Sequence, residues 1–122
     1  LARIMNQFEQ YNITMEEIHH TAKKDAPSGT AISILDGIIE NNKNKSKWHL
    51  GHAVKNESIP VNVKRTDPTP GTHSVTYSTS IDAIEIKHTA HSRDGFAQGS
   101  LTAAQWLIGK TGVFGMKDML KF

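Results

Sequence analysis

Short runs that alternate apolar and polar residues constrain the fold of this chain most strongly. Successive side chains of a strand point to opposite faces of a sheet, so such runs predict strands with one apolar face. The runs cover residues 59–63, 75–77 and 84–88. A short turn around residues 80–82 predicts a hairpin between the last two, whereas the prolines and glycine of residues 66–71 predict a long irregular turn. The apolar face of such strands must be covered by another element.

Helical spacing supplies the covering elements. Apolar residues at i, i+3, i+4 and i+7 begin at Leu1, which predicts a helix already under way at that point, with no N-cap residue before it. We therefore expect an N-terminal part of the protein to precede Leu1. The remaining predicted elements are a strand over residues 13–20, helices over residues 28–41 and 96–108, and a loop over residues 42–47.

The order of these elements is helix, strand, helix, three strands, helix. Such an order is typical of an α+β domain, and we expect a mixed, mostly antiparallel sheet with helices packed on one face. The other face of the sheet then needs cover from a second chain or domain, and we expect it to be used for oligomerisation. A length of 122 residues fits one domain with one core.

Composition excludes several classes of protein. The formal net charge is +2, and no run of Lys and Arg is interleaved with aromatic residues as on a nucleic-acid-binding surface. No apolar stretch approaches the ~20 residues that a membrane helix requires. Cys is absent, so neither disulfides nor a Cys-ligated zinc can form, and a reducing cytoplasm suits the chain. We expect a cytoplasmic protein without nucleic-acid or membrane partners.

The stretch EIHHTAKKDAPSGTA, residues 17–31, carries the strongest chemical signal. Ser28, Gly29 and Thr30 stand at the start of a predicted helix, whose first N–H groups are unpaired and whose dipole makes that end positive. Gly29 lacks a Cβ, so an anion can approach the backbone closely. The same stretch contains four proton-carrying or cationic side chains, those of His19, His20, Lys23 and Lys24. Together these groups predict a pocket for a carboxylate or phosphate with a proton donor beside it.

Simpler explanations of individual residues stay open at this point. A pair of histidines is more often structural than catalytic, and Ser-Gly-Thr before a helix is usually only a cap. Two further pairs of histidines have spacing seen among metal ligands, His49 with His52 and His88 with His91. No Cys or carboxylate set accompanies them, so we expect no metal site. We expect His88 to be a hydrogen-bonded core histidine, and Trp48 and Trp106 to lie in the core.

The stretch closely resembles the signature of the 4-hydroxy-tetrahydrodipicolinate reductase family, long called dihydrodipicolinate reductase. Two other blocks resemble the same family, IEIKHTAHSRDGFAQGSLTAAQWL at residues 84–107 and VFGMKDML at residues 113–120. The segment RTDPTPGTH at residues 65–73 departs from it, because the family often has a glycine-rich loop after the arginine. That departure lies outside the signature.

The resemblance implies a two-domain enzyme of lysine and diaminopimelate biosynthesis. An N-terminal Rossmann domain of that family binds NADH or NADPH, and a C-terminal domain binds the substrate and forms a tetramer through its sheet. Residues 1–122 resemble the C-terminal domain alone, and no G-x-G-x-x-G fingerprint occurs in them. We therefore expect a homotetramer that binds a small dicarboxylate, and we expect this chain alone to be inactive.

The resemblance also implies roles for individual residues. His19 is implied to be the general acid that protonates the substrate carbon next to the one that receives hydride. Lys23 is implied to be its cationic partner and a second proton donor. The residues implied to bind the substrate carboxylates are His20, Gly29 and Thr30, with Arg93 as a nearby cation. Two alternatives remain open, a dicarboxylate-binding module without catalysis and a purely structural assembly domain.

Overall fold

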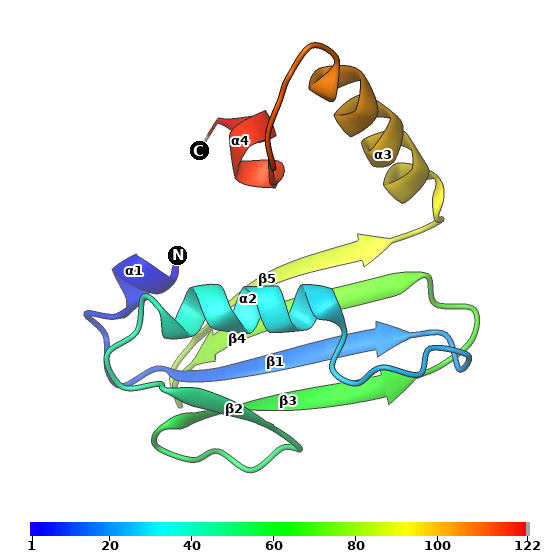
Figure 1. The fold of residues 1–122 in the computed structure, drawn as a ribbon. Helices are drawn as coiled ribbons and strands as arrows, with labels where there is room; N and C mark the ends of the chain where they lie inside the picture. Colours follow the sequence, from blue (N-terminus) through cyan, green and yellow to red (C-terminus); the bar gives the residue numbers. More distant parts are fainter. Residues whose placement is uncertain (122) are drawn as a thin grey trace. The chain divides into compact units, whose positions relative to one another are not determined.

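A computed structural model describes residues 1–121 in two compact units, Leu1–His91 and a second unit that begins at Ser92. The first unit is a five-stranded sheet with a helix lying over one face (Figure 1). Its elements are α1 (Ala2–Met5), β1 (Asn12–His19), α2 (Gly29–Ile39), β2 (Lys47–Leu50), β3 (Ser58–Arg65), β4 (Gly71–Ser78) and β5 (Ala83–Ala90). The second unit contains α3 (Asp94–Leu107) and α4 (Met116–Leu120).

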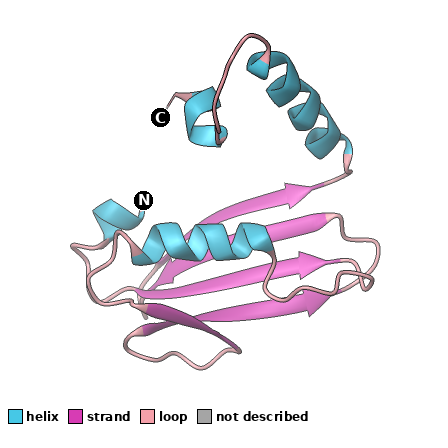
Figure 2. Cartoon of the chain, viewed as in Figure 1, coloured by secondary structure: helices cyan, strands magenta, loops and turns pink. Residues whose placement is uncertain are grey.

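The sheet has the strand order β2-β3-β1-β4-β5 (Figure 2). Within residues 1–121, β1 and β2 each pair with β3 in parallel, whereas β1–β4 and β4–β5 are antiparallel. The predicted α+β class with a mixed sheet is confirmed, with the pairings divided evenly between the two directions. The predicted hairpin is also confirmed, as β4 and β5. Strand β2 was not predicted, because it is a four-residue edge strand that follows an Asn- and Lys-rich loop.

The core lies between α2 and the sheet face beneath it. Ala31, Leu35 and Ile38 are buried on the inner side of α2, spaced to fall on one stripe of the helix. They pack with apolar residues of the central strands, chiefly Ile13, Met15, Ile59, Val61, Val75 and Tyr77. Burial of each large apolar side chain contributes about 1.5–3 kcal/mol. This packing fixes α2 across the sheet, and therefore fixes where its N-terminus lies.

Several expectations about the first unit need correction. The N-terminal helix covers only Ala2–Met5, and Met5 is the one buried member of the predicted apolar stripe. Within the described residues nothing covers Leu1, Ile4 and Phe8, which are exposed, and a helix so short gains little from its own hydrogen bonds. His88 was expected in the core, but β5 is an edge strand whose residues from Ala83 to Thr89 are all exposed.

The second face of the sheet is polar. Thr14, Glu16, Asn62, Thr76 and Glu85 line a shallow depression of about 300 Å³ on it, together with His52 and Pro60. This face follows from the two-residue period, because each of the strand residues in it alternates with a residue that faces α2. The structure leaves this face open in a single chain.

The two tryptophans lie nearer the surface than predicted. Trp48 is half-buried on β2 and packs against the edge of the core. In the second unit, Trp106 of α3 meets Phe114 edge to face, with ring centroids 5.4 Å apart, and Lys110 lies over the Trp106 ring. No residue of α3 is buried in the part of the chain that the structure describes. Among the helices within residues 1–121, none is both long and apolar enough to cross a bilayer.

Candidate functional site

The face of β1 that packs under α2 changes character halfway along the strand. Ile13 and Met15 belong to the apolar core, and the next two residues on that face, Glu17 and His19, are buried as well. Strand pairing adds two more polar residues, because Arg65 of β3 lies opposite His19 and His73 of β4 lies opposite Glu17. We call Glu17, His19, Arg65 and His73 the His19 cluster.

Glu17 is the centre of this cluster. Its side chain is fully buried, with 0% exposed surface, yet both carboxylate oxygens have donors. The backbone N–H of Ser28 donates to Oε2 at 2.8 Å, and Nη2 of Arg65 donates to Oε1 at 3.0 Å. Burial acts to raise the pKa of Glu17, but the hydrogen bonds from Ser28 and Arg65 outweigh it and hold the pKa below the usual range. Glu17 is therefore a buried carboxylate.

Two imidazoles share this carboxylate. Nδ1 of His19 and Nε2 of His73 each lie 3.9 Å from Oε2 of Glu17, and the two rings meet edge to face at 5.0 Å. Nε2 of His73 is hydrogen-bonded to Oγ of Ser28 at 3.0 Å, whereas Nδ1 of His19 is buried and has no hydrogen-bond partner among residues 1–121. Burial lowers the pKa of both histidines, and Glu17 opposes that shift in each.

The loop after β1 is tied to the end of β3 by Arg65. The Arg65 guanidinium donates from Nε to the carbonyl of Lys23 at 3.3 Å and from Nη2 to the carbonyl of Asp25 at 2.6 Å. Lys23 in turn pairs its Nζ with Oδ1 of Asp25 at 2.9 Å and keeps about a fifth of its side chain exposed (21%). Lys23 is thus held close enough for its charge to act on both His19 and His73.

The start of α2 lies against the same cluster. Ser28 is the N-cap of α2, and its Oγ accepts from the N–H of Ala31 at 3.2 Å while its own N–H binds Glu17. Gly29 and Thr30 are exposed, and no acceptor for their N–H groups lies within the described residues. A Cβ on Gly29 would meet nothing within 4 Å. Free N–H groups at a helix N-terminus favour an anion.

The structure brings some of the predicted site residues together and leaves others apart. His19 and Lys23 lie at one end of the sheet, next to the Ser28 cap that precedes Gly29 and Thr30. His20 directly follows the end of β1 and is half-buried. Arg93 belongs to the second unit, is exposed, and precedes α3 directly.

The sequence did not lead us to predict four residues that lie at this end of the sheet. Glu17 and His73 had a usable signal, because the two-residue period puts each on the α2-facing side of its strand. Arg65 and Gly71 had none, since their roles depend on which strands pair. Gly71 packs so closely on His19 that an added Cβ would lie 3.3 Å from Nε2 of that ring.

Glu17, His19 and His73 also form the one set of potential metal ligands found within residues 1–121. One donor atom from each lies within 4.8 Å of the others. Ligand atoms around a tetrahedral zinc are about 3.3 Å apart, since each bond is about 2.0 Å long. The set is wider than that, both oxygens of Glu17 already accept hydrogen bonds, and Arg65 and Lys23 add positive charge. The geometry suits acid–base chemistry better than metal binding.

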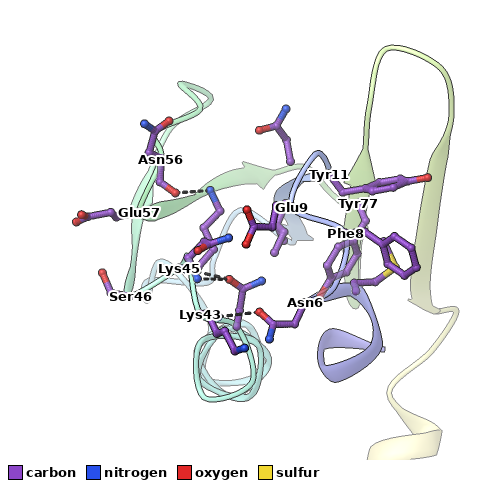
Figure 3. A pocket seen from close by; sticks show the side chains of 15 residues that line it. Asn6, Phe8, Glu9, Tyr11, Lys43, Lys45, Ser46, Asn56, Glu57 and Tyr77 are labelled. Atoms are coloured by element: carbon purple, nitrogen blue, oxygen red, sulfur yellow. Dashed lines mark hydrogen bonds between the residues drawn. The ribbon is translucent and has the colours of Figure 1, made fainter.

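A larger cavity, of about 580 Å³, lies at the other end of β1 (Figure 3). It is lined by residues of the α1–β1 connection and by the loops around Lys45 and Asn56. Nζ of Lys45 donates to the carbonyl of Asn56 at 2.6 Å, and the backbone N–H of Lys43 donates to Oδ1 of Asn6 at 2.8 Å. None of the residues of the His19 cluster lines this cavity. The larger cavity and the titratable side chains of the cluster therefore lie at opposite ends of β1.

Comparisons with known proteins agree on one family. Residues 1–120 match the family model described as dihydrodipicolinate reductase, C-terminus. A 4-hydroxy-tetrahydrodipicolinate reductase of Christiangramia forsetii is 52% identical over 120 residues, which are 98% of this chain and 50% of that protein. One of Methanoculleus marisnigri is 37% identical over 113 residues, 90% of this chain and 45% of that protein. The chain spans about half the length of the curated relatives it matches.

A solved structure supports the fold. The chain resembles a dipicolinate-bound dihydrodipicolinate reductase from Paenisporosarcina sp. TG-14 with a TM-score of 0.64. The likeness covers 96% of this chain and 50% of that one, at 21% sequence identity.

Proposed function

Because the chain belongs to the C-terminal family of dihydrodipicolinate reductases, we propose that it is the substrate-binding domain of a 4-hydroxy-tetrahydrodipicolinate reductase. In this proposal residues 1–122 bind the dicarboxylate substrate and protonate it. The hydride comes from NADH or NADPH, held mainly by a nucleotide-binding domain elsewhere in the full-length protein. The reaction belongs to lysine and diaminopimelate biosynthesis.

The substrate carboxylates bind at the N-terminus of α2. The N–H groups of Gly29 and Thr30 and the Thr30 hydroxyl are exposed there, and His20 and Lys23 add donors from the loop after β1. Hydrogen bonds to charged groups contribute about 1.5–3 kcal/mol each. A substrate held in this way is oriented before it reacts, which lowers the entropic part of the barrier.

His19 is the general acid, and Lys23 is its cationic partner and a second proton donor. As hydride adds to one carbon, His19 gives its proton to the adjacent carbon, and solvent later returns a proton to the imidazole. The observation that carries this proposal is the contact between the cap of α2 and the His19 cluster. The Ser28 N–H and Oγ contact Glu17 and His73, so an anion bound at Gly29 and Thr30 lies beside a buried imidazole.

Dipicolinate binding to the full-length protein tests the anion site. Dipicolinate is the compound bound to the related Paenisporosarcina enzyme, and it carries two carboxylates. By calorimetry, Thr30→Val should weaken binding about tenfold, because it deletes a hydroxyl donor to a carboxylate. Lys23→Ala should weaken binding and reduce its dependence on salt. Ser33→Ala, which deletes an exposed hydroxyl one turn further along α2, is the matched control. Affinity within twofold of the parent in both site variants would contradict this placement of the substrate.

We further propose that the protein is a homotetramer assembled through the polar face of its sheet. The open depression around Thr14, Asn62 and Thr76 supports this, because a sheet face left open in one chain can pack against a second copy. Light scattering of the full-length protein should give four times the mass of one chain. A monomer at high protein concentration would contradict the proposal.

A further inference from the structure

We propose that Glu17 is a positioning residue for His19, whose buried carboxylate orients the imidazole and favours its protonated form. The inference deepens the proposed function, because it rests on His19 as the acid. Glu17 itself need not touch the substrate. Its position in the middle of the cluster, rather than at the surface, is the first reason for this assignment.

The carboxylate of Glu17 is fixed before any substrate arrives. The Ser28 N–H holds one oxygen and the Arg65 guanidinium holds the other, so the group cannot rotate away. A charge held at a fixed place acts on its neighbour without further reorganisation. Oε2 is also the oxygen that faces both imidazoles.

His19 presents a nitrogen that lacks a partner. Its Nδ1 is buried, has no hydrogen bond within residues 1–121, and lies 3.9 Å from Oε2 of Glu17. A buried polar atom without a partner is uncommon in a folded protein. A shift of about 1 Å brings the two atoms to the 2.7–2.9 Å of a charge-assisted hydrogen bond. The other edge of the ring faces Gly71, where an added Cβ would lie 3.3 Å from Nε2 and 3.4 Å from Cδ2.

The other charges around His19 oppose its protonation. Burial lowers its pKa most, and His73 on β4, Lys23 on the loop after β1 and Arg65 on β3 lower it further. Lys23 is paired with Asp25, and His88 on β5 acts on His73 rather than on His19. Glu17 is the group that acts in the opposite direction. Without Glu17 the pKa of His19 would fall further, and a smaller share of the acid would carry its proton.

The test is the pH profile of the full-length protein carrying Glu17→Gln. An amide keeps the shape of the side chain but carries no charge. A general acid must be protonated, so kcat/KM falls as pH rises through its pKa. Loss of the Glu17 charge lowers that pKa, and the fall should move to lower pH by about one unit. At pH 8 we expect about tenfold lower kcat/KM, and a clearly smaller loss at pH 5, because the loss shrinks as pH falls and His19 becomes protonated in both proteins. A purely structural defect would lower activity equally at both.

Glu40→Gln is the matched control, since Glu40 is an exposed carboxylate at the C-terminal end of α2, away from the His19 cluster and from the polar face of the sheet. It should leave the profile in place. If the Glu17→Gln protein does not fold, Glu17→Asp withdraws the charge by one methylene and should move the profile the same way by less. If neither the profile nor the titration of the His19 ring moved in the folded variants, the proposal would be overturned.

Titration of the His19 ring by NMR separates this inference from the proposed function. The ring should titrate at lower pH in Glu17→Gln than in the parent. A ring that titrates unchanged would contradict the role of Glu17. A shifted ring with an unshifted kinetic profile would instead leave Glu17 acting on His19 and count against His19 as the acid.

Discussion

The two halves of β1 use the same strand geometry for different purposes. Met15 has Val61 on one side and Val75 on the other, and α2 covers all three. Two residues further along the same face, Glu17 has His73 beside it, and His19 has Arg65. The first half excludes polar groups, whereas in the second Nδ1 of His19 is the one fully buried side-chain polar atom without a hydrogen bond within the described residues.

This difference shows how a small domain holds a polar cluster out of water. The apolar half positions α2 across the sheet, and α2 then delivers the Ser28 cap to Glu17. Buried polar groups cost free energy unless they are hydrogen-bonded, and the cap supplies one of the required donors. The apolar half should therefore determine stability, and the polar half should determine pH dependence.

The largest effect on stability is expected in the apolar half. Met15→Ala should lower the free energy of unfolding by about 3 kcal/mol, because it removes a fully buried side chain between two strands and leaves a cavity. Denaturant unfolding of the full-length protein measures this. If the pH profile of activity also moved in this variant, the apolar half would determine pH dependence as well as stability, which contradicts the division between the two halves. A loss below about 1 kcal/mol would show that this half is not the core.

The site could be predicted from the sequence only where its residues are local. His19, Gly29 and Thr30 lie within twelve positions of one another in one motif. Helical spacing also correctly predicted that α2 begins at the Ser28-Gly29 end of this motif. Arg65 and Gly71 depend on the pairing of β1 with β3 and β4, for which a single sequence carries no signal. Alternation correctly indicated which residues share a face of a strand, but could not show that β5 would be exposed, and so His88 was placed wrongly.

A smaller effect is expected from the polar half, and it depends on pH. Burial lowers the pKa of His19 and His73 in the folded chain, so the unfolded chain binds protons more readily. Stability should be constant above the unfolded value near 6.5 and fall as pH drops through it toward the folded values. Thermal unfolding between pH 7.5 and pH 5.5 measures the slope of stability against pH. His73→Gln should reduce this slope by about half, since one of the two buried histidines no longer titrates.

His91→Gln is the control for that experiment, because His91 is exposed directly after β5. Its slope should equal that of the parent. If His73→Gln and His91→Gln gave the same slope, the polar half would not be the source of the pH dependence.

The central claim is that the buried imidazole at the end of β1 donates a proton during catalysis, and His19→Gln in the full-length protein tests it most directly. Glutamine keeps a hydrogen-bonding side chain of similar reach but delivers a proton poorly. Steady-state kinetics should show kcat lowered by about 10²-fold or more with KM altered less, the pattern of an interaction made in the transition state. A kcat within about threefold of the parent would show that His19 is not the acid.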